Sequence, residues 1–132
     1  MKVIVDTSAY YALAEPGDGN HLSARATLAR LAQGGCGLFT VSYAVSETAA
    51  LIQARLGLRP LRLFRSAIES GSTIIWVDAS LHAAAWDELE RIGRRQVSLA
   101  DCALAVAALR EGITDVFAYG PHFALWGLNV IG

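Results

Sequence analysis

The feature that most constrains the fold of this chain is an alternation between short apolar runs and longer stretches of helical pattern. Five runs are dominated by apolar, largely β-branched or aromatic side chains and are bounded by Gly, Ser or Asp: Lys2–Asp6, Gly37–Val41, Thr73–Val77, Asp115–Ala118 and Leu128–Ile131. Because apolar character is nearly continuous along each run, the runs predict strands that are buried on both faces.

The stretches between these runs are rich in Ala, Leu and Arg and predict helices over His21–Gln33, Tyr43–Leu56, Leu61–Ser70, Ser80–Arg91 and Leu99–Glu111. Glycines such as Gly57 and Gly93 follow the helical patterns, as is common just past a helix C-terminus. Pro60 separates two helices, since the residue before a proline resists the α conformation. Strands that alternate with helices predict an α/β fold, with a mainly parallel sheet between two layers of helices.

Length and charge narrow the classes of protein that fit. A chain of 132 residues predicts a single domain spanning 1–132. A formal net charge of -1 excludes a protein that holds nucleic acid by bulk positive charge, so any contact with RNA has to be local. The longest uncharged stretches, Leu31–Ser46 and Val116–Gly132, contain glycines and polar residues and predict no membrane span. Cys36 and Cys102 lack metal-ligand spacing, which favours reduced thiols in a cytoplasmic protein.

Three acidic residues stand where chemistry is expected in such a fold. Asp6 closes the first strand, Glu47 lies in the first turns of the helix after the second strand, and Asp101 begins the last helix. If the strands are parallel, these carboxylates converge at one edge of the sheet. Unpaired carboxylates repel each other there, and an oxygen-rich cluster binds Mg²⁺ or Mn²⁺, which removes that repulsion.

Each of these acids also has a purely structural interpretation. Asp6 fits an N-cap, and Ser98 and Asp101 have the spacing of a capping box. Glu47 fits an acid placed in the first turn by the helix dipole. The combination favours a site, because Glu47 and Asp101 interrupt helical faces that are otherwise small or apolar. Asp78, after the third strand, fits a plain N-cap.

Three segments carry a resemblance to a known family. The opening VIVDTSAYYAL, the central VSETAAL and the later SLADCALAVAALREGI followed by VFAYGPHF resemble the PIN-domain family, particularly its VapC-type toxins, over essentially the whole chain. The resemblance implies a parallel five-stranded sheet flanked by helices and a ribonuclease that depends on Mg²⁺ or Mn²⁺. It implies that Asp6, Glu47 and Asp101 are catalytic and bind the metal, with Thr7 and Ser98 in support. It also implies a small antitoxin as partner and a homodimer.

The sequence departs from this family at one position that matters for the metal. The family usually carries a fourth acid in a segment resembling T-x-D-x-x-F, where this chain has Gly120 in place of the Asp and Ala118 in place of the Thr. Asp115 begins the same strand, roughly 16 Å away at the usual rise of a strand, and is not a ready substitute. The missing ligand weakens a second metal most, since one Mg²⁺ retains several waters in any case.

Other residues are candidates for contact with RNA or a partner. Arg94 and Arg95 precede the helix that carries Asp101 and are candidates for RNA phosphate contact. The resemblance implies a partner groove for the antitoxin, and its candidate residues are Tyr10, Tyr11, Leu58, Leu61 and Phe64. The three histidines share no ligand spacing and are interpreted as ordinary surface or core residues: His21, His82 and His122.

Two functions of different class remain open. The leading one is a metal-dependent endoribonuclease that hydrolyses RNA phosphodiester bonds as the toxin of a type II toxin–antitoxin pair. The alternative is a catalytically weakened PIN domain that serves as an RNA- or partner-binding module, which Gly120 favours. A phosphoacceptor domain is disfavoured, because such domains resemble receiver proteins with a late Lys, and this chain has no Lys after Lys2.

Overall fold

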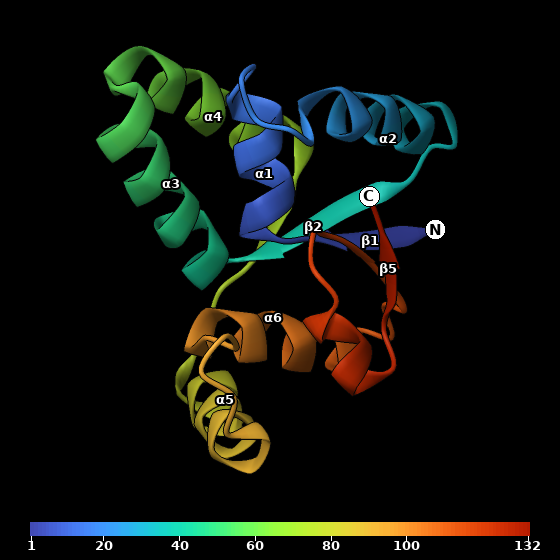
Figure 1. Cartoon of the computed structure of the whole chain (residues 1–132). Coiled ribbons are helices and arrows are strands. Elements are labelled where there is room, and N and C mark those ends of the chain that lie inside the picture. Colours follow the sequence, from blue (N-terminus) through green and yellow to red (C-terminus); the bar gives the residue numbers. More distant parts are fainter.

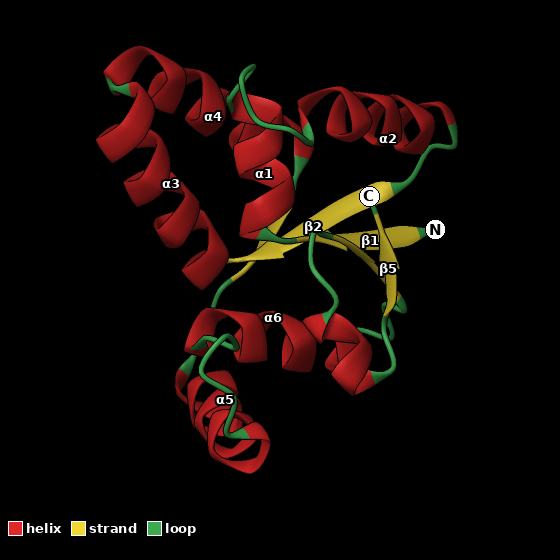
Figure 2. Cartoon of the chain, in the orientation of Figure 1, coloured by secondary structure: helices red, strands yellow, loops and turns green.

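The computed structural model describes residues 1–132 as a five-stranded parallel sheet between helices (Figures 1 and 2). The strands are β1 (Lys2–Val5), β2 (Gly37–Val41), β3 (Thr73–Ile75), β4 (Asp115–Phe117) and β5 (Asn129–Ile131). The helices are α1 (Thr7–Ala14), α2 (His21–Gln33), α3 (Ser42–Leu56), α4 (Leu58–Gly71), α5 (Ala79–Ile92) and α6 (Leu99–Arg110), with the short 3₁₀ helix η1 (His122–Trp126) before β5. The predicted fold class is confirmed.

The strand order β3-β2-β1-β4-β5 places the first strand in the centre of the sheet. The chain runs outward from β1 to β2 and β3, then crosses to β4 and β5 on the other side. Val5 pairs with Phe117 in register, and the backbone N–H of Asp6 donates to the carbonyl of Phe117 at 3.0 Å. The strand order therefore reverses between β1 and β4, which is where ligands bind in open parallel sheets.

The two faces of the sheet carry separate apolar cores, because alternate residues of a strand point to opposite sides. Val3 and Val5 pack under α1 to α4, whereas Ile4 packs on the other face with Leu104 of α6 and Phe123 of η1. Figure 1 shows this division, with α1 to α4 on one side of the sheet and α5 and α6 on the other. All five of these residues are almost completely buried.

Pro60 does not separate two helices in the way the sequence predicts. Helix α4 already begins at Leu58, directly after Gly57, which has a φ of +94°. Pro60 thus occupies the first turn, where its missing N–H has no intrahelical partner to lose. Gly57 adopts the positive φ and is the residue that separates α3 from α4.

The cysteines and the lengths of the helices complete the description of the fold. Both cysteines are free, Cys102 is buried and Cys36 is half-buried. Burial, followed by the charge of Asp101, raises the pKa of the Cys102 thiol to about 11, so this thiol stays protonated and unreactive. None of the helices is both long and apolar enough to cross a bilayer.

Candidate active site

A polar groove of about 470 Å³ opens at the carboxyl ends of the central strands, where the strand order reverses. Its lining includes all three acids that the sequence singles out, Asp6, Glu47 and Asp101, which come from three different elements. The groove also contains Asp18 from the loop between α1 and α2, an acid that no pattern in the sequence marks as part of a site. The predicted convergence of carboxylates is therefore present in the fold.

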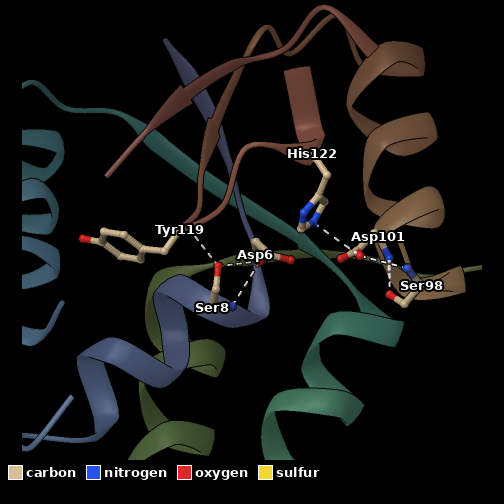
Figure 3. Close-up of polar contacts among 6 residues, drawn as sticks. All are labelled: Asp6, Ser8, Ser98, Asp101, Tyr119 and His122. Carbon is tan, nitrogen blue, oxygen red and sulfur yellow. Dashed lines mark hydrogen bonds and ion pairs between the residues drawn. The ribbon is translucent and has the colours of Figure 1, made fainter. Parts of the chain in front are cut away.

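Asp6 caps helix α1 with one carboxylate oxygen and leaves the other free. Its Oδ2 accepts hydrogen bonds from the backbone N–H of Ser8 at 3.1 Å and from the Ser8 hydroxyl at 2.6 Å, and Oδ1 has no partner in the protein. The Ser8 hydroxyl also accepts from the backbone N–H of Tyr119 at 2.9 Å, just past β4 (Figure 3). Ser8 thereby fixes Asp6 relative to the neighbouring strand, a role that the sequence does not indicate.

Asp101 is placed in the same way by the first turn of α6. Its backbone N–H donates to the Ser98 hydroxyl at 3.0 Å, while its Oδ2 accepts from the Ser98 backbone N–H at 2.9 Å (Figure 3). The predicted capping box is thus present. Since Oδ1 of Asp101 accepts no hydrogen bond in the protein, capping uses one oxygen and leaves one for a ligand, and the two interpretations of these acids are compatible.

Glu47 differs from the other two acids, and its helix-dipole interpretation is wrong. Helix α3 begins at Ser42, so Glu47 lies in the second turn, and the first turn contains no acid. The dipole effect decays within the first turn and does not explain this residue. Nearby, the hydroxyl of Thr7 donates to the carbonyl of Ala44 at 3.3 Å and ties the start of α1 to α3.

Two carboxyl groups of the groove, those of Asp6 and Glu47, have raised pKa values. The pKa of Asp6 is raised chiefly by burial and further by the charge of Asp101, while the hydrogen bonds from Ser8 and the nearby His122 act in the opposite direction. Glu47 is exposed, yet partial desolvation at the groove raises its pKa, and the charges of Asp101 and Asp6 add to the effect. These are the shifts expected of carboxylates gathered without a cation.

His122 also lines this groove, a position that the interpretation of the histidines as ordinary surface or core residues does not anticipate. Its Nε2 lies 3.4 Å from Oδ2 of Asp101, is buried, and has no hydrogen-bond partner (Figure 3). Gly120 adopts a φ of +130° at the turn that leads into η1, a conformation that side chains disfavour. The sequence signal that could have found His122 is its place two residues after the missing acid.

The donor set fits a divalent cation in its chemistry, although the acids do not form a closed cage. Hard carboxylate oxygens are the ligands that Mg²⁺ and Mn²⁺ select, and Asp6 and Asp101 each present one oxygen without a partner. No three Asp, Glu, His or Cys side chains are close enough together to hold an ion as they stand. Glu47, being long and exposed, is the acid with the most freedom to move toward an ion.

Three further residues that the sequence analysis considers are Asp115, Arg94 and Arg95, and they lie in three different places. Asp115 pairs with Val3, at the opposite end of the strands from Asp6, and accepts a hydrogen bond from Asn129 at 3.0 Å. It therefore does not replace the missing acid, as the sequence predicts. Arg94 lines an adjoining groove of about 530 Å³, which shares Gln96 and His122 with the acidic groove, whereas Arg95 lines neither.

The residues predicted to form a partner groove do not share one surface. Tyr10 and Phe64 line an apolar groove of about 340 Å³ beside α4, and Phe64 and Leu61 line a second one of about 390 Å³ on the other side of that helix. Tyr11 instead lines the acidic groove, and Leu58 lines none of these. The sequence thus identifies helices that border the grooves but not the residues that share each one.

Comparisons with known proteins agree with this geometry. A family model described as PIN domain matches residues 3–125. The 23S rRNA-specific endonuclease VapC20 of Mycobacterium tuberculosis is 29% identical over 128 residues, which are 95% of this chain and 94% of that protein. The crystal structure of this VapC20, described as a sarcin-ricin loop cleaving toxin, matches with a TM-score of 0.83 at 27% identity and covers 96% of this chain and 95% of its own.

A more distant structure shares the fold alone. VapBC2 from Rickettsia felis, solved bound to a DNA fragment from its promoter, matches with a TM-score of 0.73 at 17% identity and covers 99% of this chain and 98% of its own. Because the family match spans most of the sequence and the sheet agrees in structure, the chain belongs to the PIN-domain family, as a homologue of VapC20.

Proposed function

We propose that this protein is a metal-dependent endoribonuclease that hydrolyses RNA phosphodiester bonds as the toxin of a type II toxin–antitoxin pair. The observation that carries the proposal is the single groove that Asp6, Glu47 and Asp101 line together. The endonuclease VapC20, specific for 23S rRNA, supports structured ribosomal RNA as the substrate class.

In this proposal Asp6, Glu47 and Asp101 hold Mg²⁺ or Mn²⁺, the first and last through the oxygens that capping leaves free. A divalent ion bound there supplies an activated water and stabilises negative charge on the phosphate. The raised pKa values of Asp6 and Glu47 support this assignment, because a cation removes the repulsion that contributes to them.

The other polar residues of the region orient these acids and the RNA. Ser8 and Ser98 fix the carboxylates of Asp6 and Asp101 through the hydrogen bonds described above. Arg94, in the adjoining groove, is placed to contact the phosphate of a neighbouring nucleotide, for which a guanidinium is well suited.

A small antitoxin is the proposed partner, and a cytoplasmic homodimer is the proposed state of the toxin. Two apolar grooves flank α4, and both are lined by Phe64. An apolar helix of an antitoxin fits such grooves in the manner of helix-in-groove recognition. Cytoplasmic localisation agrees with two free cysteines and with RNA as the substrate.

The test is cleavage of a sarcin-ricin loop hairpin by the wild type, Asp6→Asn and Asp101→Asn, with Mg²⁺, with Mn²⁺ and with EDTA. We expect cleavage that requires the metal and falls at least about 100-fold in either variant. Asp78→Asn is the matched control. Asp78 also caps a helix, since its Oδ1 accepts a hydrogen bond from the backbone N–H of Leu81 at 2.8 Å, but it lies outside the groove. Equal cleavage by the wild type and both site variants contradicts the proposal.

One observation favours the alternative of an RNA- or partner-binding module. Gly120 contributes no side chain, and no three potential ligands are arranged to hold an ion. This alternative predicts that wild-type protein retains the hairpin in a binding assay without cutting it in Mg²⁺ or Mn²⁺. Asp6→Asn and Asp101→Asn then leave RNA affinity unchanged or improve it, since each removes a negative charge that opposes the RNA.

A further inference from the structure

We propose that His122 takes the place of the missing acid and supplies the fourth ligand of the metal through Nε2. The inference rests on the proposed metal-dependent function and deepens it, since it makes the site a mixed oxygen and nitrogen site. Mg²⁺ strongly prefers oxygen donors, whereas imidazole suits transition metals. The site therefore selects Mn²⁺ over Mg²⁺ more strongly than four carboxylates would.

The imidazole ring of His122 lies beside Asp101, one of the proposed metal ligands. Nε2 of His122 lies 3.4 Å from Oδ2 of Asp101. Two donors that bind one ion at about 2.1 Å are separated by roughly 3 Å, so a contact of this length puts the imidazole within reach of an ion held by the Asp101 carboxylate, whose Oδ1 is free while Oδ2 also caps α6. His122 therefore lies beside Asp101, in the groove that Asp6 also lines (Figure 3).

Nε2 of His122 lacks a hydrogen-bond partner. The atom is buried, and its contact with Asp101 does not have the geometry of a hydrogen bond. Buried polar atoms are nearly always paired, and an exception calls for an explanation such as an ion that the atom binds. The ring is held in this position by Phe123, whose fully buried ring packs against it with centroids 4.7 Å apart.

The ring of His122 also lies against Gly120. A Cβ built on Gly120 lies 3.5 Å from Cε1 and 3.6 Å from Nδ1 of His122. Both distances are ordinary van der Waals contacts, so the imidazole ring lies directly against the position where the family carries its acid. The φ of +130° at Gly120 is also a conformation that an Asp adopts rarely. His122 is thus the side chain that lies next to the position of the missing acid.

The decisive experiment is pulsed EPR of Mn²⁺ bound to the full-length protein, which detects ¹⁴N nuclei coordinated to the ion. We expect ¹⁴N coupling in the wild type and its loss in His122→Gln. The control is His82→Gln, because His82 bonds to Tyr43 and Trp86 on α3 and α5 and lies outside the groove. If His122→Gln fails to fold, which circular dichroism reports, absence of ¹⁴N coupling in the wild type still overturns the inference.

The competing role of His122 is an imidazolium that pairs with Asp101 and binds no metal, and the same experiment separates the two. Bound Mn²⁺ without ¹⁴N coupling overturns the inference while leaving the proposed nuclease intact, provided that Asp101→Asn still abolishes Mn²⁺ binding and cleavage. Absence of any Mn²⁺ binding and of metal-dependent cleavage overturns both.

A second measurement tests metal selection without relying on catalysis. Isothermal titration with each metal gives the ratio of the Mn²⁺ to the Mg²⁺ association constant. His122→Asp restores an all-oxygen site, and we expect the ratio to fall roughly tenfold. An unchanged ratio in a folded His122→Asp protein overturns the inference.

Discussion

Replacing Asp6 with Asn should stabilise the fold in the absence of metal while abolishing cleavage. Asp6 is only 7% exposed, and its pKa is raised chiefly by burial and further by repulsion from Asp101. A carboxyl whose pKa is higher in the folded than in the unfolded chain reduces the free energy of unfolding once it ionises. The ionised Asp6 is therefore a destabilising group at neutral pH, and Asn removes its charge.

The size of the effect follows from two opposing contributions. Each unit by which folding raises a carboxyl pKa corresponds to about 1.4 kcal/mol of lost stability at neutral pH. Asn matches Asp as an N-cap, and its oxygen accepts the same two hydrogen bonds from Ser8, although a neutral acceptor binds more weakly. We expect relief of the burial and repulsion to outweigh the weaker hydrogen bonds, so the free energy of unfolding and the Tm in EDTA should both rise.

The assay is thermal unfolding in EDTA, followed by circular dichroism, at about pH 7.5 and about pH 5. The wild type regains the lost stability as the pH falls through the raised pKa of Asp6, and the recovery is complete below the ordinary value of 3.8. The advantage of Asp6→Asn should therefore narrow toward low pH. Asp78→Asn, at an exposed cap, should change stability by less than about 0.5 kcal/mol at both pH values.

The result that refutes this reasoning is an Asp6→Asn protein less stable than the wild type by about 1 kcal/mol or more at neutral pH. Asp6 would then be chiefly a structural cap whose ionised form stabilises α1. Saturating Mn²⁺ adds a second criterion. An ion that binds only the folded wild type should make the wild type more stable than Asp6→Asn, the reverse of the order in EDTA.

Two further changes test the surroundings of the acids. Ser8→Ala removes the hydroxyl that joins Asp6 to the backbone of Tyr119, so urea titration should show a loss of about 1–3 kcal/mol and cleavage should fall roughly tenfold or more; full activity would show that the acid needs no such support. Arg94→Ala should weaken RNA binding and reduce the slope of log K against log salt by about 0.7, with a smaller change in Arg95→Ala. Equal slopes in the two variants would show that Arg94 contacts the RNA phosphates no more than Arg95 does.

Much of the fold is predictable here because its determinants are local. Continuous apolar runs such as Lys2–Val5 can be buried on both faces only in a covered sheet, and the helices between them force parallel connections. The observed boundaries differ from the predicted ones by a residue or two at most elements. The larger errors are α1 and η1, which the predicted helical stretches omit, and the start of α4 at Leu58, which depends on the positive φ of Gly57 and outweighs the expectation from Pro60.

The convergence of the acids could also be predicted, but the state of each oxygen could not. Parallel strands bring Asp6 and Asp101 to one edge whatever their side chains do. Whether an acid caps a helix or faces a ligand looks like a choice in the sequence, yet the structure assigns the two tasks to different oxygens of one carboxylate. That division depends on side-chain torsions, which residue spacing does not encode.

By itself the sequence determined the α/β fold and the three acids at the edge of the sheet, because each follows from local pattern or from strand direction, and its resemblance to the PIN-domain family marked Gly120 as the position of a missing acid. Only the tertiary structure decided what stands beside that gap. His122 reaches Asp101 because a turn at Gly120 and the buried ring of Phe123 direct it there. Such a contact between distant segments leaves no periodic trace in a sequence, since it depends on how whole elements pack.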